Sequence, residues 1–301
     1  MAQLHYVRPR KVSTDQVART MLVMVCGLAT SLLTAFALAF TELRSGIAAY
    51  SYSLWVIFPI GAMAAGALAA SGYWAGSRFL AIRPGRLMLV GVLFVSTMSW
   101  FAIQWLIWLM LEVDGLRARD IIPFLQFVQL SIESTSLSIE NVDTGALGKL
   151  GYPYVLLQII GFSAGGWAVY WYLQNTPWCE DCGVYMKEQP TLYRMPKDGE
   201  PFQPHIDKIY ELLSAEKYRE AVAEHIHFGQ PAVHNQPLQS TMRLSLCPKC
   251  NGSILHYALQ SKRENGSFQT IPKTDVIVWS DANLQAVVDE ANFLAAASKA
   301  A

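Results

Sequence analysis

The sequence predicts two parts, a membrane all-α four-helix bundle and a small α+β domain that binds a metal. Apolar residues make up 52% of the 301 residues and charged residues only 15%, whereas soluble domains carry about 25% charged residues. The charges are also unevenly spread: residues 20–178 hold seven basic and seven acidic side chains, and residues 177–301 hold 12 and 15. We therefore expect a transmembrane domain over residues 20–176 and a soluble domain, which contains two paired cysteine motifs, over residues 177–301.

Four uncharged, apolar stretches predict the spans of the transmembrane domain. A helix that rises 1.5 Å per residue needs about 20 apolar residues to cross a hydrocarbon core of roughly 30 Å. The stretches follow an N-terminal segment, residues 1–19, and cover residues of about 20–41, 54–77, 87–111 and 152–176. Helices buried in a soluble core would carry charges on their outer faces, and these stretches carry none.

Basic residues beside the spans predict the orientation of the chain. They lie before the first span or between the second and the third: Arg8, Arg10, Lys11, Arg19, Arg78, Arg83 and Arg86. Because short cytoplasmic segments are enriched in Lys and Arg, we expect a multi-pass protein of the cell (inner) membrane with both termini in the cytoplasm. A signal peptide cleaved near Ala35, Ala37 or Ala39 is the alternative, although the first apolar run is longer than a usual signal core.

The connection over residues 112–149 is expected outside the cytoplasm. Ile121, Leu125 and Ile132 repeat with helical spacing, and Asp120 stands where a helix cap is favoured. The uncharged part of this helix has only 12 residues, which is too short to cross a membrane. We expect the helix to lie on the membrane surface, with a re-entrant segment as the alternative.

Small residues in the second and fourth spans predict close helix contacts, because they let two backbones approach. Seven of them form three series in which every fourth residue is small. The series are Ala62, Gly66 and Ala70, then Gly72 and Gly76, and finally Gly161 and Gly165. These faces fit either a neighbouring helix of the same chain or a protein partner, including a second copy. The spans contain no ionisable side chain of the kind that coupled transport uses, so a transport or channel subunit is a secondary expectation.

The strongest chemical signal is a pair of C-x2-C motifs, Cys179 with Cys182 and Cys247 with Cys250. A turn of this length places two thiolates on one side of a tight loop, and two such loops supply the four sulfurs of a tetrahedral metal site. The glycine or asparagine that follows each second cysteine suits a left-handed backbone in the turn. The 64 residues between the motifs exceed the compact spacing of about 15–20 residues, so we expect an inserted substructure.

The two cysteine loops resemble the knuckles of a zinc ribbon, in which a metal ion joins short β-hairpins. The resemblance covers the loops and their flanking strands, and no family is recognised for the whole chain. It implies that the four cysteines are the ligands of a zinc ion. The motifs CEDCG and CPKCN also resemble the knuckles of rubredoxin, a one-iron electron carrier that has glycine where this chain has Asn251. Iron is therefore the alternative metal.

Disulfides and a redox-active dithiol are the other uses of four cysteines. Disulfides need an oxidising compartment, whereas the expected orientation places this domain in the reducing cytoplasm. A dithiol redox centre needs one C-x2-C motif, usually in a βαβ unit that this sequence does not contain. Four thiolates leave zinc no open coordination position, so the site is expected to be structural and no catalytic or cofactor-binding residue is predicted.

The rest of the soluble domain is predicted from hydrophobic spacing. A helical insertion at about 204–229 faintly resembles one tetratricopeptide unit, and its His225 and His227 point to different sides of a helix. Three strands are expected near residues 184–195, 253–260 and 268–279, the last two joined by a tight turn at 264–266. A final helix is expected near residues 281–297, with Asp281 as its cap.

The first functional hypothesis is a binding module. A membrane anchor would present a zinc-stabilised cytoplasmic domain to a protein partner, as in an accessory, assembly or sensor subunit. A membrane-bound electron-transfer protein with a rubredoxin-like iron site is the alternative. Nucleic-acid binding is not expected, because the soluble domain carries more acidic than basic residues. No phosphate loop, nucleophile elbow or H-E-x-x-H motif predicts an enzyme.

Overall fold

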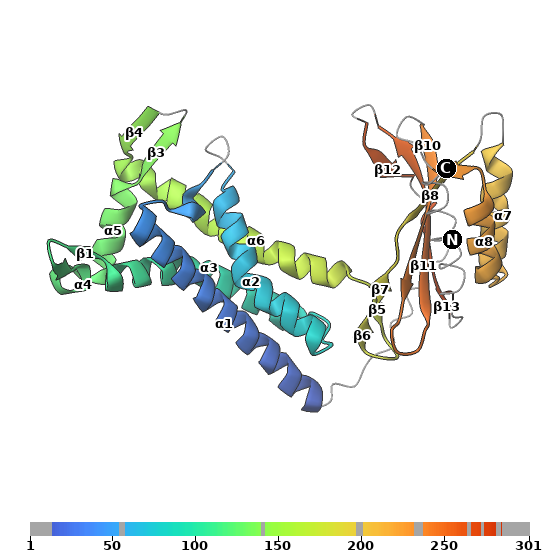
Figure 1. The fold of residues 1–301 in the computed structure, drawn as a ribbon, viewed down its shortest axis with the longest axis horizontal. Helices are drawn as coiled ribbons and strands as arrows, with labels where there is room; N and C mark the ends of the chain where they lie inside the picture. Colours follow the sequence, from blue (N-terminus) through green and yellow to red (C-terminus); the bar gives the residue numbers. More distant parts are fainter. Residues whose placement is uncertain are drawn as a thin grey trace. The chain divides into compact units, whose positions relative to one another are not determined.

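The chain divides into a helical unit, Lys11–Asn175, and an α/β unit that contains Thr176–Ala301 (Figure 1). The computed structural model describes residues 14–53, 58–139, 142–196, 201–231, 237–263, 266–271 and 274–280, together with Leu284. Most of the expected N-terminal segment, the expected turn at Glu264 and Asn265, and all of the expected last helix except Leu284 lie outside these residues.

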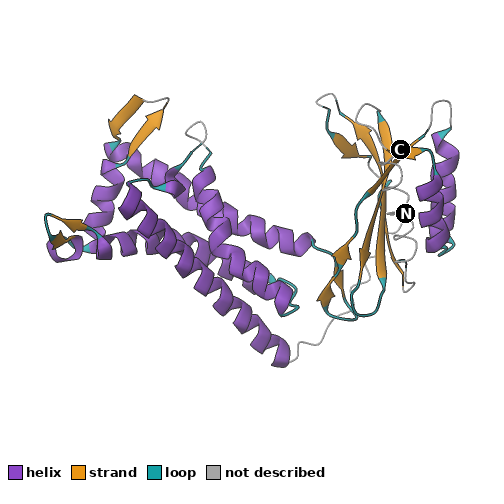
Figure 2. Cartoon of the chain, in the orientation of Figure 1, coloured by secondary structure: helices purple, strands orange, loops and turns teal. Residues whose placement is uncertain are grey.

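Four long helices form the helical unit (Figure 2): α1 (Thr14–Ser45), α2 (Ile60–Phe79), α3 (Arg86–Met110) and α6 (Gly151–Asn175). Both α2 and α3 pack against α1 and α6. Buried side chains such as Trp100, Ile103 and Phe162 form the core between them. A short 3-10 turn, η1 (Ala49–Ser51), precedes α2 and adds the buried Tyr50 to the same core.

Glycines bring these helices into backbone contact. A Cβ atom added at Gly66 would collide with the carbonyl oxygen of Phe162, and one at Gly165 would collide with the carbonyl oxygen of Met63. The small residues that the sequence marks as contact faces are all buried in the unit: Ala62, Gly66, Ala70, Gly72, Gly76, Gly161 and Gly165. These faces therefore pack helices of this chain against one another.

The predicted four-helix membrane bundle is wrong. In the described part of the chain, two helices are long and apolar enough to cross a membrane, Val17–Ser45 within α1 and Arg86–Met110, which is α3. The helices α2 and α6 occupy the other two predicted spans, but glycine, alanine, serine and aromatic residues replace much of the aliphatic content that raises hydropathy. The absence of charge, from which the spans were inferred, also suits helices that pack closely inside a unit.

The connection between α3 and α6 contains more structure than a single surface helix. Its elements are β1 (Glu112–Val113), β2 (Leu116–Arg117), α4 (Ala118–Ile121), α5 (Phe124–Ser134), β3 (Ser136–Ile139), β4 (Val142–Ala146) and η2 (Gly148–Leu150). The expected helix is broken because a residue before proline avoids the helical region, and Ile122 is extended with φ −137° and ψ 147°. Asp120 consequently lies inside α4 and does not cap α5.

An antiparallel sheet of seven strands forms the α/β unit, with the order β12-β11-β10-β8-β9, while β13 also pairs with β11 and β7 with β10. The strands are β7 (Lys187–Glu188), β8 (Leu192–Met195), β9 (Gln230–Pro231), β10 (Leu238–Leu246), β11 (Ser253–Lys262), β12 (Phe268–Thr270) and β13 (Val276–Ser280). The strand expected over 184–195 is divided into three short ones, beginning with β6 (Val184–Tyr185). The long strand β10 was not predicted.

Two helices, α7 (Phe202–Ser214) and α8 (Tyr218–His227), cover one face of the sheet (Figure 2). Ile209 and Val222 of these helices pack on Met242, Leu255 and Tyr257 of the sheet. Alternate residues of β10 and β11 point to this core because successive side chains of a strand face opposite sides.

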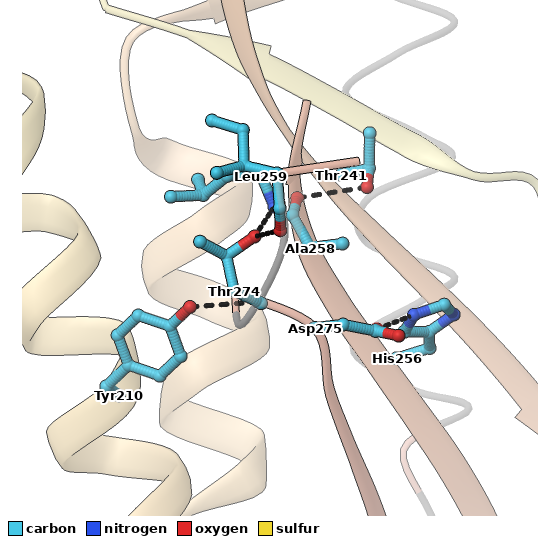
Figure 3. A network of polar contacts seen from close by, with 8 residues as sticks. Tyr210, Thr241, His256, Ala258, Leu259, Thr274 and Asp275 are labelled. Atoms are coloured by element: carbon cyan, nitrogen blue, oxygen red, sulfur yellow. Dashed lines mark hydrogen bonds and ion pairs between the residues drawn. The ribbon is translucent and has the colours of Figure 1, made fainter. Parts of the chain in front are cut away.

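Polar contacts around Thr274 explain why the strand expected over 268–279 is interrupted (Figure 3). The hydroxyl of Tyr210 in α7 donates to the carbonyl oxygen of Thr274 at 2.9 Å. The Thr274 hydroxyl accepts from the backbone N–H of Leu259 at 3.3 Å and donates to the Ile271 carbonyl at 2.7 Å. These bonds hold Thr274 against α7 and β11, so β12 and β13 are separate strands.

Candidate metal centre

The first cysteine loop lies between two short paired strands. β5 (Trp178–Cys179) pairs with β6 so that Cys179 faces Val184. The backbone N–H of Gly183 donates to the carbonyl oxygen of Cys179 at 2.9 Å, and Gly183 has φ of +60°. Glycine adopts this left-handed conformation without a Cβ penalty, so it closes the turn and directs both thiols to one side.

The second cysteine loop joins β10 to β11. The N–H of Cys247 donates to the carbonyl oxygen of Gly252 at 2.8 Å. The N–H of Asn251 donates to the carbonyl oxygen of Cys247 at 3.1 Å. Asn251 takes the left-handed position with φ of +59°, as asparagine does more readily than most residues. The loop thus repeats the geometry of the first one.

The sheet brings the two loops together across the inserted residues. β7 follows β6, which closes the first loop, and pairs with the end of β10, with Lys187 opposite Leu246. Because Leu246 immediately precedes Cys247, this register carries one cysteine pair to the other. The inserted helices α7 and α8 pack on the sheet and do not enter the cluster.

The four thiols form one compact cluster. All four Sγ atoms lie within 4.8 Å of one another, and those of Cys179 and Cys250 are 3.8 Å apart. Four sulfurs at about 2.3 Å from a tetrahedral metal would be separated by about 3.8 Å. The donor set therefore fits a single tetrahedral ion with only small adjustments of the side chains.

Burial and backbone donors give the four thiols unequal properties. Cys179 and Cys247 are buried beside Met186, Cys182 is half-buried and Cys250 is exposed. Burial raises the pKa of the Cys179 thiol. Burial also acts to raise the pKa of Cys247. Hydrogen bonds from the backbone N–H groups of Cys250 and Lys249 outweigh this effect and lower the pKa of Cys247 to about 7. A bound cation would hold all four sulfurs as thiolates.

Backbone N–H groups and one aromatic ring complete the surroundings of the second loop. The N–H of Lys249 donates to the Cys247 sulfur at 3.5 Å, and that of Gly252 donates to the Cys250 sulfur at 3.4 Å. A Cβ atom at Gly252 would lie 3.2 Å from the Cys250 sulfur and 3.0 Å from Cζ2 of Trp279. Sequence reasoning missed the role of Gly252, although a glycine two residues after a ligand cysteine was the available signal.

The other candidate side chains lie elsewhere. Among the described residues, the four cysteines form the one group of three or more His, Cys, Asp and Glu side chains whose ligand atoms converge. Cys26 belongs to the helical unit, and His256 contacts Asp275. His225 is fully buried and His227 is exposed, so they face different sides of α8 as expected. His234 lies outside the described residues.

Comparison with known proteins adds no assignment, since no family model, no curated protein and no solved structure matches this chain. The four-cysteine cluster is consistent with a zinc-ribbon-like module and could hold a metal ion.

Proposed function

We propose that the chain is a membrane-attached accessory, assembly or sensor protein whose α/β unit is held together by one zinc ion and binds a protein partner. The observation that carries this proposal is the convergence of four thiols within 4.8 Å of one another. Four thiolates complete the tetrahedral coordination of zinc, so no position is left for substrate or water. Such an ion stabilises a fold and does not catalyse a reaction.

Iron is the second candidate because the cluster reaches the surface. Cys250 is exposed, and a thiolate at the surface gives electrons a short path to a partner. A one-iron site of this kind would make the chain a membrane-bound electron carrier. Zinc and iron both fit four thiolates, and they differ in colour and in redox activity.

Membrane attachment is assigned to α1 and α3. Both are long and apolar enough to cross, and large apolar side chains of α1 such as Leu33 and Phe36 are exposed. Arg86 begins α3, with Arg78 and Arg83 shortly before it, so this end is proposed to face the cytoplasm.

Exposed apolar side chains of β13 support a binding role. Strand register places Ile277 and Trp279 on the face opposite α7 and α8, and they are 58% and 37% exposed. Neighbouring aromatic and aliphatic side chains that are exposed on one strand form a typical contact point for another protein. An Ile277→Asp variant should keep its metal and its fold while losing a crosslinked partner.

The deciding experiment measures metal content and visible absorbance of the detergent-purified full chain. We expect one zinc per chain and no colour, because four thiolates bind zinc without a visible transition. Red protein that contains iron would replace this proposal with electron transfer. Protein that contains no metal, and whose protease resistance is unaffected by chelators, would contradict both.

A further inference from the structure

The helical unit contains a pocket that the metal centre does not explain. Its volume is about 880 Å³, and it is bounded by the end of α1, the η1 turn and parts of α2, α3, α5 and α6. Pockets for small molecules in proteins usually measure about 300–1,000 Å³. We infer that this pocket binds a small organic compound through a protonated amine, with Glu42 as its anchor.

A directed chain of hydrogen bonds ends at Glu42. The hydroxyl of Ser131 donates to Oε1 of Gln104 at 3.3 Å, and Nε2 of Gln104 donates to the hydroxyl of Tyr50 at 3.0 Å. The Tyr50 hydroxyl in turn donates to Oε2 of Glu42 at 2.9 Å. Gln104 and Tyr50 are each only 4% exposed. Every donor in this chain points toward the carboxylate, which stabilises and orients its negative charge.

Among the described residues, the carboxylate of Glu42 has no cationic partner. Within the described residues no ion pair includes Glu42, and Tyr50 is its only side-chain hydrogen-bond partner. The guanidinium of Arg44 lies over the ring of Phe40, 5.4 Å from its centroid. Glu42 also stands in the last turn of α1, where the helix dipole disfavours a negative charge. A cation in the pocket would relieve both costs.

The opposite wall of the pocket is fixed and uncharged. Nε1 of Trp100 donates to Oε1 of Gln158 at 3.2 Å, and Nε2 of Gln158 donates to the hydroxyl of Ser51 at 2.9 Å. Glu42 is the one charged side chain among the described residues that line the pocket. The lining therefore selects a ligand with one positive charge and an otherwise uncharged body.

The ammonium group could come from a free amine or from the headgroup of an ethanolamine lipid. Both offer the same N–H donors to Oε1 of Glu42 and to the neighbouring oxygens. Binding of free ethanolamine in lipid-free detergent points to the first source. Binding only of phosphatidylethanolamine, and not of phosphatidylglycerol in the same micelles, points to the second. Either result supports the ammonium site.

Calorimetric titration of the detergent-purified full chain at pH 7 tests the inference. We expect saturable binding of ethanolamine or its lipid and no binding of ethylene glycol, which replaces the ammonium by a hydroxyl. Glu42→Gln should weaken binding about tenfold or more, because the ammonium would then donate to a neutral amide oxygen and not to a carboxylate. The matched control is Glu112→Gln, which neutralises an exposed carboxylate of the same unit that pairs with Arg117.

Three results would overturn the inference: equal binding of ethylene glycol, an unchanged affinity in Glu42→Gln, or no saturable binding of either amine source. Circular dichroism reports whether Glu42→Gln retains its helices. The comparison of ethanolamine with ethylene glycol on the unmodified chain decides the matter even if that variant fails to fold.

Discussion

The sulfur atoms of Cys179 and Cys250 lie 3.8 Å apart although 71 positions separate them in the sequence. One cysteine belongs to a short hairpin before the sheet, and the other to the loop between its two longest strands. Their contact depends on the pairing of Lys187 with Leu246, which joins β7 to the end of β10. A metal ion at this point would connect the first hairpin of the unit to its two longest strands, so its loss should affect far more than two loops.

Replacing Cys247 by serine tests this dependence. The variant loses a buried ligand, and structural zinc sites contribute on the order of 10 kcal/mol to folding. We expect the α/β unit to become sensitive to protease while the helical unit keeps its helical circular dichroism. The matched control is Cys26→Ser, which should change neither metal content nor protease resistance because Cys26 lies in the helical unit. A Cys247→Ser variant as resistant as the parent would contradict a structural metal.

Two buried histidines predict acid sensitivity of the α/β unit. His225 is fully buried beside His205, their ring centroids 5.8 Å apart. Burial, with a further contribution from His205, lowers the pKa of His225 to about 3. Because this folded pKa lies below the unfolded value of about 6.5, the stabilising effect of a neutral His225 is complete above pH 6.5. It is then lost progressively as the pH falls toward 3.

The expected loss is about 1 kcal/mol between pH 6.5 and 5.5 and approaches about 1.4 kcal/mol for each further pH unit. Denaturant unfolding of the full chain at pH 6.5 and 5.5 measures it by a fluorescence signal from the α/β unit. His225→Gln should reduce the pH dependence, since its amide can still reach the Leu192 carbonyl that His225 Nε2 faces at 3.4 Å. His227→Gln serves as control because His227 is exposed on the same helix. Equal pH dependence in both variants would assign the effect to other groups, such as the metal ligands.

The metal-binding loops could be predicted because their chemistry is local. Two cysteines three positions apart with a following glycine or asparagine determine a turn, and the structure places all four sulfurs in one cluster. The strand β10 was missed because its residues 239–241 and 245 are polar although they are buried. Thr241, for example, donates to the Ala258 carbonyl at 3.1 Å across the sheet. Such burial depends on neighbouring strands, which a single segment does not reveal.

In the helical unit, the prediction assigned two helices too many to the membrane. The lack of charge in α2 and α6 was interpreted as membrane insertion, yet these helices are rich in the small residues that pack them against each other. Charge count does not distinguish an apolar surface that faces lipid from one that faces another helix. The small-residue spacing contained this information: Gly66 and Gly165 lie where α2 and α6 meet.

The contact between α2 and α6 yields the last prediction. Gly66→Ala introduces a Cβ atom where the Phe162 carbonyl already lies, and overpacking of this kind costs about 1–3 kcal/mol. Thermal unfolding in detergent, followed by circular dichroism, should show a lower midpoint for this variant. Gly85→Ala is the matched control, because no atom lies within 4 Å of the added Cβ and Gly85 has a negative φ of −110°. Since the same atom is added in both variants, a midpoint lowered equally by both would contradict a backbone contact between α2 and α6.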